Sequence, residues 1–163
     1  MKSFYTFITT IFSLLLTLNV VAVDTELKNK QVLVSKYGST TWVIGNVDSF
    51  GTLVRNKKGS DENLIKIVEG LSDKNLISFE SVNLPGHFLR HQGSKLKWHN
   101  TKAAGPFKAD ATFMIVKGLT GRDTVSFRSV NYPTHYITID KNKELWIREK
   151  PDKKSASFKL MLK

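Results

Sequence analysis

The sequence contains no cysteine. Small secreted domains usually depend on disulfides, so this chain has to be stabilised by a packed core instead. Without cysteine and without a G-x-S-x-G motif, neither a cysteine nucleophile nor a serine-hydrolase elbow is available. The four histidines are not spaced like metal ligands, and we therefore predict no metal site, no catalytic residues and no cofactor.

Long apolar runs are also absent, except at the N-terminus. Phe4–Leu18 is mostly apolar, Lys2 precedes it, and Val20-Val21-Ala22 has the small residues of a cleavage site. We predict that residues 1–22 are a signal peptide, that the protein is secreted, and that no membrane insertion remains after cleavage. An uncleaved membrane anchor is the alternative, but threonine, serine and asparagine residues dilute the apolar run.

Acidic residues are few compared with basic ones. The chain has 25 Lys and Arg against 14 Asp and Glu, a net charge of +11. Lys2 is the one charged residue of the predicted signal peptide, so residues 23–163 carry +10. Such an excess favours acidic polysaccharides or anionic cell surfaces as partners, although it also simply promotes solubility. Secretion and the lack of an Arg-rich run argue against a nucleic-acid partner.

The sequence repeats itself. The segment "ISFESVNLPGHFLRH" begins at residue 77 and "VSFRSVNYPTHYITI" at residue 125, 48 positions later. The same spacing relates "ENLIKIVEGL" at 62–71 to "DATFMIVKGL" at 110–119, and "SASFKLMLK" at 155–163 is a more divergent copy. An earlier stretch, 42–56, aligns without gaps on 77–91. Three unequal copies are therefore visible, over residues 31–71, 76–119 and 124–163.

Each copy has the period-two alternation of β-strands, with turns at Asn83–Gly86 and Asn131–Thr134. Four strands per copy and three copies predict an all-β chain, a single β-trefoil domain over residues 23–163. A closed threefold barrel would cover the apolar face that one copy cannot bury alone. Phe79, Phe127, Phe113 and Phe158 are expected in its core. A β-sandwich and a short propeller fit three units less well.

The repeat motifs resemble a known family. "SFESVNLPGHFLRH", then "KADATF", then "SFRSVNYPTHYI" are similar to the arabinofuranose-binding domain of α-L-arabinofuranosidases, the AbfB or family 42 carbohydrate-binding module. The resemblance covers most of residues 31–163. It implies a β-trefoil in which each repeat can offer a small pocket for an arabinofuranosyl side chain.

The resemblance also implies which residues bind. The family pocket uses the His and the following aromatic residue of one motif and the Asp that opens "DATF". In the second repeat these positions hold His91, Gln92 and Asp110. The first repeat offers a weaker pocket with Asn56 and Glu62. In the third repeat, Thr138-Ile139-Asp140 stands where the family has Arg, His and the aromatic residue, and Ser155 replaces the Asp, so the defining groups are missing.

We therefore predict a secreted, non-catalytic, lectin-like glycan-binding protein with one sugar pocket in the second repeat. One alternative is a basic β-trefoil that binds acidic glycans or an anionic surface through its lysines. Another is a β-trefoil ligand or inhibitor of a protein. A third is α-L-arabinofuranosidase activity by family inheritance, although the resemblance is to the accessory domain and no motif identifies a catalytic carboxyl pair.

Overall fold

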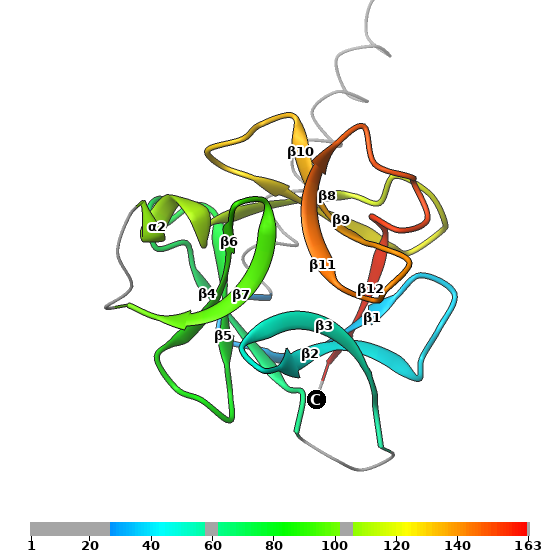
Figure 1. Cartoon of the computed structure of the whole chain (residues 1–163), viewed down its shortest axis with the longest axis horizontal. Helices are drawn as coiled ribbons and strands as arrows, with labels where there is room; N and C mark the ends of the chain where they lie inside the picture. Colours follow the sequence, from blue (N-terminus) through cyan, green and yellow to red (C-terminus); the bar gives the residue numbers. More distant parts are fainter. Residues whose placement is uncertain (1–26, 58–61, 102–105, 163) are drawn as a thin grey trace, which may run out of the picture.

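The computed structural model describes residues 27–57, 62–101 and 106–162. The predicted signal peptide lies outside these ranges. Within them the chain forms twelve β-strands and the short helix α2 (Phe107–Asp110), as Figure 1 shows. No helix of the described part is long and apolar enough to cross a membrane.

Six of the strands form a closed antiparallel barrel. Neighbours pair in the ring β1, β4, β5, β8, β9, β12 and back to β1. Because the ring closes, the barrel has no free edge that would pair with another chain. Its strands are β1 (Gln31–Lys36), β4 (Ile65–Glu69), β5 (Ile77–Ser81), β8 (Phe113–Lys117), β9 (Val125–Ser129) and β12 (Phe158–Leu162).

The other six strands form three hairpins that cover one end of the barrel. They are β2 (Trp42–Val47) with β3 (Phe50–Arg55), β6 (His87–Gln92) with β7 (Lys95–Asn100), and β10 (His135–Ile139) with β11 (Leu145–Glu149). The inner strands β3, β7 and β11 pair with one another around a pseudo-threefold axis (Figure 1). We call these three hairpins the cap. A six-stranded barrel with such a cap is a β-trefoil, which confirms the predicted fold class.

The predicted phenylalanine layer lies at the centre of the barrel. All four predicted rings are at most 1% exposed, and the Phe127 ring contacts both Phe79 and Phe158, with centroids 4.9 and 5.4 Å apart. In the first repeat, the equivalent strand positions hold Val34 and Ile65, which are also buried. Aliphatic residues at these places explain why the first copy is hard to recognise in the sequence.

The structure corrects the alignment of the first repeat. Residues 42–56 form β2 and β3, whereas residues 77–91 form β5 and β6, so the ungapped alignment is wrong by one strand. In the β6–β7 hairpin His91 pairs with Leu96, and the equivalent pair in the β2–β3 hairpin is Asn46 with Gly51. Strands with the same alternation look alike in sequence, so alternation alone does not tell which strand of a repeat a segment forms.

Candidate functional site

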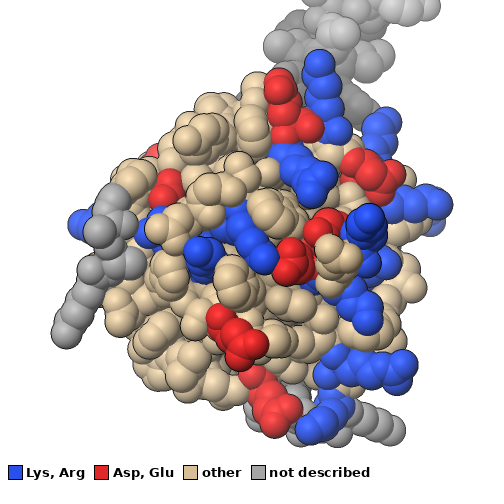
Figure 2. Space-filling view, viewed as in Figure 1, with Lys and Arg blue, Asp and Glu red and all other residues tan. Residues whose placement is uncertain are grey.

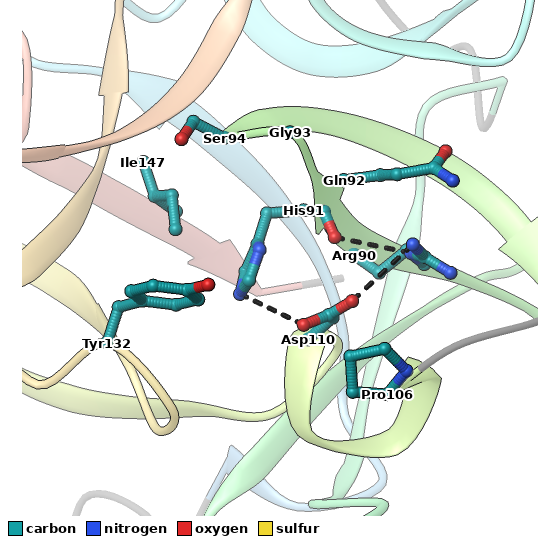
Figure 3. A pocket seen from close by; sticks show the side chains of 9 residues that line it. All are labelled: Arg90, His91, Gln92, Gly93, Ser94, Pro106, Asp110, Tyr132 and Ile147. Carbon is teal, nitrogen blue, oxygen red and sulfur yellow. Dashed lines mark hydrogen bonds and ion pairs between the residues drawn. The ribbon is translucent and has the colours of Figure 1, made fainter.

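A cavity of about 350 Å³ lies between the second and third repeats. Its walls come from β6 and the following turn, from α2, from the turn between β9 and β10, and from β11 (Figure 3). The residues that line it are Arg90, His91, Gln92, Gly93, Ser94, Pro106, Asp110, Tyr132 and Ile147. Both repeats therefore build the pocket that the sequence assigned to the second repeat alone.

His91 and Asp110, which are 19 positions apart in sequence, meet in this pocket. The His91 Nε2 atom lies 3.5 Å from Asp110 Oδ1, and each residue is only 4% exposed. Asp110 is the last residue of α2, and its carboxylate faces β6, where it contacts Arg90 and His91. The structure thus brings two of the three predicted residues together, while their binding of a sugar stays a prediction.

Arg90 balances the charge of the Asp110 carboxylate. Its Nη2 atom lies 3.4 Å from Asp110 Oδ2, and the two side chains are 3% and 6% exposed. The Arg90 Nε–H donates to the His91 carbonyl oxygen, and the guanidinium lies 5.7 Å from the centroid of the Phe107 ring. A carboxylate this deeply buried needs such a partner, because an unpaired buried charge is strongly unfavourable.

Asn131 and Ser129 complete the hydrogen-bond network from the third repeat. The Asn131 amide nitrogen donates to Asp110 Oδ1 at 2.8 Å, and its oxygen accepts from Ser129 Oγ at 2.9 Å. The same oxygen lies 3.0 Å from His91 Nε2 and accepts the proton of that nitrogen when the ring is neutral. This arrangement makes Nδ1 of His91 an acceptor.

The environment of His91 favours its neutral form. Burial is the largest cause that lowers its pKa from 6.5, and the positive charges of Arg90 and His135 act in the same direction. The hydrogen bond to Asn131 and the charge of Asp110 act in the opposite direction but do not outweigh burial. At neutral pH the pocket therefore contains one carboxylate and one uncharged imidazole.

This lowered pKa predicts an acid-sensitive fold. The unfolded chain takes up a proton on His91 near pH 6.5, whereas the folded chain does so at lower pH, so the free energy of unfolding should fall as pH drops below 6.5. His99, whose pKa is also lowered mainly by burial, adds to the effect. Urea unfolding between pH 7.5 and 5 measures this slope. In the double variant His91→Gln, His99→Gln, the free energy of unfolding should depend less on pH. A pH dependence as steep as that of the wild type would contradict the role given to these two histidines.

Tyr132 supplies an aromatic ring that the sequence analysis missed. Its ring meets the His91 ring edge-on, with centroids 5.3 Å apart and an interplanar angle of 77°, and Tyr132 is 49% exposed. Gln92, predicted at the aromatic position, instead points away from Asp110 (Figure 3) and accepts a hydrogen bond from Lys97 Nζ at 3.3 Å. A search confined to one repeat could not find Tyr132, because it comes from the next one. The available signal was its place in the repeated S-V-N-x-P turn.

The first repeat does not assemble the same site. Asn46, rather than the predicted Asn56, holds the place equivalent to His91, and Asn56 lies at the other end of β3, where its N–H bonds to the Thr41 carbonyl. Glu62 is exposed and lies 3.9 Å from Lys57 Nζ. Gly45 stands in the place of Arg90, where a side chain would collide with Val54.

The third repeat has a cavity at the equivalent place, but different side chains line it. There Thr138 and Ser155 share a 2.7 Å hydrogen bond in the place of the Arg90 and Asp110 ion pair, and Ile139 replaces His91. The cavity, about 340 Å³ in volume, is lined by Ile139 and Ser155 among others. A neutral hydroxyl pair thus replaces the charged pair of the second repeat.

Comparison with known sequences identifies the family. The profile described as "Alpha-L-arabinofuranosidase B (ABFB) domain" matches residues 35–160. The chain belongs to the AbfB domain family. No curated protein sequence matches it. Membership in the AbfB family supports a carbohydrate-binding module.

Solved structures agree with this assignment. An arabinofuranosidase complexed with arabinofuranosyl-α-1,2-xylobiose is similar with a TM-score of 0.74 and 26% identity, over 82% of this chain and 31% of that one. This AbfB chain therefore spans about a third of the arabinofuranosidases that it matches. The BEL β-trefoil matches with a TM-score of 0.63 and 13% identity, over 83% of this chain and 94% of that one. SeviL bound to asialo-GM1 saccharide matches with a TM-score of 0.59 and 8% identity, over 82% and 98%. The last two likenesses concern the fold alone.

Proposed function

We propose that this AbfB protein is a secreted, non-catalytic carbohydrate-binding module that holds one neutral sugar residue in the pocket between its second and third repeats. The observation that carries the proposal is the buried cluster of Asp110, His91 and Arg90 beneath a half-exposed aromatic ring. Secretion rests on the N-terminal sequence. An arabinofuranosyl group is the sugar that the AbfB family and its arabinofuranosidase neighbours favour.

The pocket offers the three kinds of contact that a sugar needs. The Asp110 carboxylate and the Nδ1 atom of His91 accept hydrogen bonds from hydroxyl groups. The Ser94 hydroxyl adds an adaptable polar contact. Tyr132 presents an apolar ring for the C–H face of a sugar. The neighbours of Asp110 hold its carboxylate in place before any ligand arrives, which reduces the entropy lost on binding.

The size and number of such pockets set the expected affinity. A cavity of about 350 Å³ is at the small end of ligand sites and suits one monosaccharide. One shallow sugar pocket typically binds near millimolar concentration, about −4 kcal/mol. Since the first and third repeats lack the carboxylate and imidazole pair, this chain by itself gains little avidity from them.

Hydrolysis is the weaker alternative. A glycosidase needs two carboxyl groups about 5–10 Å apart, across the bond that is cut. Among the described residues that line the pocket, Asp110 carries the single carboxyl group, and that group is tied to Arg90. The lining of the pocket therefore supports binding over catalysis, and an assay with 4-nitrophenyl α-L-arabinofuranoside would test for turnover.

Tyr132→Ala tests the pocket without disturbing the fold. We expect the affinity for arabinan to fall about tenfold, because the variant removes the ring against which the sugar stacks while leaving the buried cluster intact. Isothermal titration calorimetry measures the change. Leu84→Ala is a matched control, since Leu84 holds the equivalent turn position between the first and second repeats and is 43% exposed. Equal losses in both variants would count against this pocket.

A further inference from the structure

The outer face of the cap carries large aromatic and basic side chains. Outward-facing residues of β3, β7 and β11, together with Glu144 just before β11, surround the pseudo-threefold axis, and all six are partly exposed. They are Phe50, Thr52, Lys95, Lys97, Glu144 and Trp146. In the view of Figure 1 the cap lies in front, and Figure 2 shows basic side chains on this face with acidic ones between them.

Basic groups lie over the aromatic rings of this face. Lys95 Nζ is 4.2 Å from the centroid of the Phe50 ring and 5.5 Å from that of Trp146. Lys97 Nζ approaches Phe50 to 5.4 Å, and the Arg148 guanidinium approaches Trp146 to 5.7 Å. The rings and the cations hold one another in place, so the charges of this face are partly ordered without a ligand.

The charge of the face is not cancelled internally. Lys95 forms an ion pair with Glu144, with Nζ and Oε1 2.7 Å apart. Lys97 donates to the uncharged amide of Gln92, and the exposed Arg148 contacts the Trp146 ring. The Trp146 Nε1–H donates to Asp140 Oδ2 at 3.2 Å, so Lys95, Lys97 and Arg148 share the face with two acidic residues, Glu144 and Asp140. A positive excess remains, and an anionic group is the complementary ligand.

The face is continuous with the sugar pocket. Gln92, which lines the pocket, accepts the hydrogen bond from Lys97 of the cap. Ser94 and Ile147, also in the lining, are joined by a backbone bond of 2.7 Å from the Ile147 N–H to the Ser94 carbonyl. Their chain neighbours, Lys95 and Trp146, are on the cap and pair across the strands. A chain of sugars that leaves the pocket over this turn therefore meets Lys95, Lys97 and Trp146 next.

We propose that the cap face, centred on Lys97, Trp146 and Arg148, is a second subsite that binds the uronate-bearing part of a polysaccharide whose neutral branch occupies the pocket. The inference builds on the proposed function and specifies its ligand class as an acidic polysaccharide with neutral sugar branches. Carboxylates of the uronates pair with Lys97 and Arg148, and sugar C–H faces lie on Trp146. The pocket thus selects the neutral branch, and the cap selects the uronate-bearing part of the polysaccharide.

The test compares one polysaccharide before and after removal of its charge. The ligand is an arabinoxylan that carries glucuronate branches, and its carboxyl-reduced form, in which each uronate is converted to a neutral sugar, is the matched probe. The wild-type protein should bind the native form about 3- to 10-fold more tightly at low salt, as expected for two exposed charge contacts. The advantage should shrink in 0.5 M NaCl, at roughly which concentration exposed charges are screened.

Two double variants test whether the preference for the native polysaccharide depends on the cap face. Lys97→Gln with Arg148→Gln should lose the preference for the native form while binding the carboxyl-reduced form like the wild type. Lys117→Gln with Arg122→Gln removes the same charge from exposed positions at the far end of the barrel, where β8 turns back into β9, and should keep the preference. Equal loss in both double variants would overturn the cap subsite in favour of an unspecific charge effect.

The outcomes separate the two proposals. If the wild type fails to bind neutral arabinan, the sugar pocket itself is refuted. If it binds arabinan but does not distinguish the native from the reduced arabinoxylan, the cap subsite is refuted and the pocket stands. A single-stranded DNA oligonucleotide that binds as tightly, with the same dependence on Lys97 and Arg148, would also overturn the cap subsite, because the surface would then be a general polyanion site.

Discussion

Asp110→Ala is expected to lower the free energy of unfolding by about 3 kcal/mol and to abolish sugar binding. The stability loss follows from burial. The carboxylate is 3.4 Å from the Arg90 guanidinium, and the two side chains are 3% and 6% exposed. Removing one partner of a buried ion pair typically costs about 3–5 kcal/mol, because the remaining charge stays in a poorly solvated site. Urea unfolding followed by tryptophan fluorescence measures the loss.

Asp110→Asn separates stability from binding. The amide keeps the shape of the side chain and one oxygen to accept the Asn131 hydrogen bond, but it leaves the Arg90 charge unpaired, so we expect a stability loss of about 2–3 kcal/mol, no larger than that of Asp110→Ala. Sugar binding should still fall strongly, since only one of the two oxygens remains as an acceptor. If the asparagine variant binds arabinan as well as the wild type, Asp110 is a structural residue and not a sugar ligand.

Phe127→Ala is expected to cost about 3–5 kcal/mol, the range found when a buried phenylalanine is truncated. Phe127 is fully buried at the centre of the barrel, and its ring contacts Phe79 from the second repeat and Phe158 from the third. The cavity left behind would lie among three barrel strands that cannot easily close on it, because the ring of hydrogen bonds is continuous. Thermal and urea unfolding both report the change.

Tyr132→Ala provides the comparison for this core variant. It also removes an aromatic ring, but one that is 49% exposed, so its unfolding free energy should change by less than about 0.5 kcal/mol. A similar loss in both variants would mean that the phenylalanine layer is not the main source of stability. Phe127→Leu should retain much of the wild-type stability, since it leaves a smaller cavity.

The repeat pattern was sufficient to predict the trefoil because it is carried by strongly alternating segments and by turns with proline and asparagine. It was insufficient to align the first copy. There Val34 and Ile65 replace phenylalanines, and the alternation of β2 and β3 imitates that of β5 and β6. Period-two patterns identify strands but not their order within a repeat, since any two strands with one buried face look alike.

The prediction of the site had a similar limit. The motif resemblance led to His91 and Asp110, and the structure places them 3.5 Å apart. It did not lead to Asn131 or Tyr132, which reach the pocket from the following repeat. Nor did it show that Arg90, a motif residue of the same strand, is the charge partner of Asp110. Contacts between repeats depend on how the copies rotate about the axis, and no single copy contains that information.

The amino-acid order alone was enough to predict an all-β trefoil, because alternation, turn residues and repeats are local features. The resemblance to AbfB motifs added His91 and Asp110 of the second copy as the predicted sugar ligands. Only the tertiary structure decided that the pocket lies between two copies, that Gln92 points away from Asp110 and bonds to Lys97, and that the cap adjoins the pocket. These features arise when distant strands close into a barrel, because closure brings together side chains that no local pattern relates.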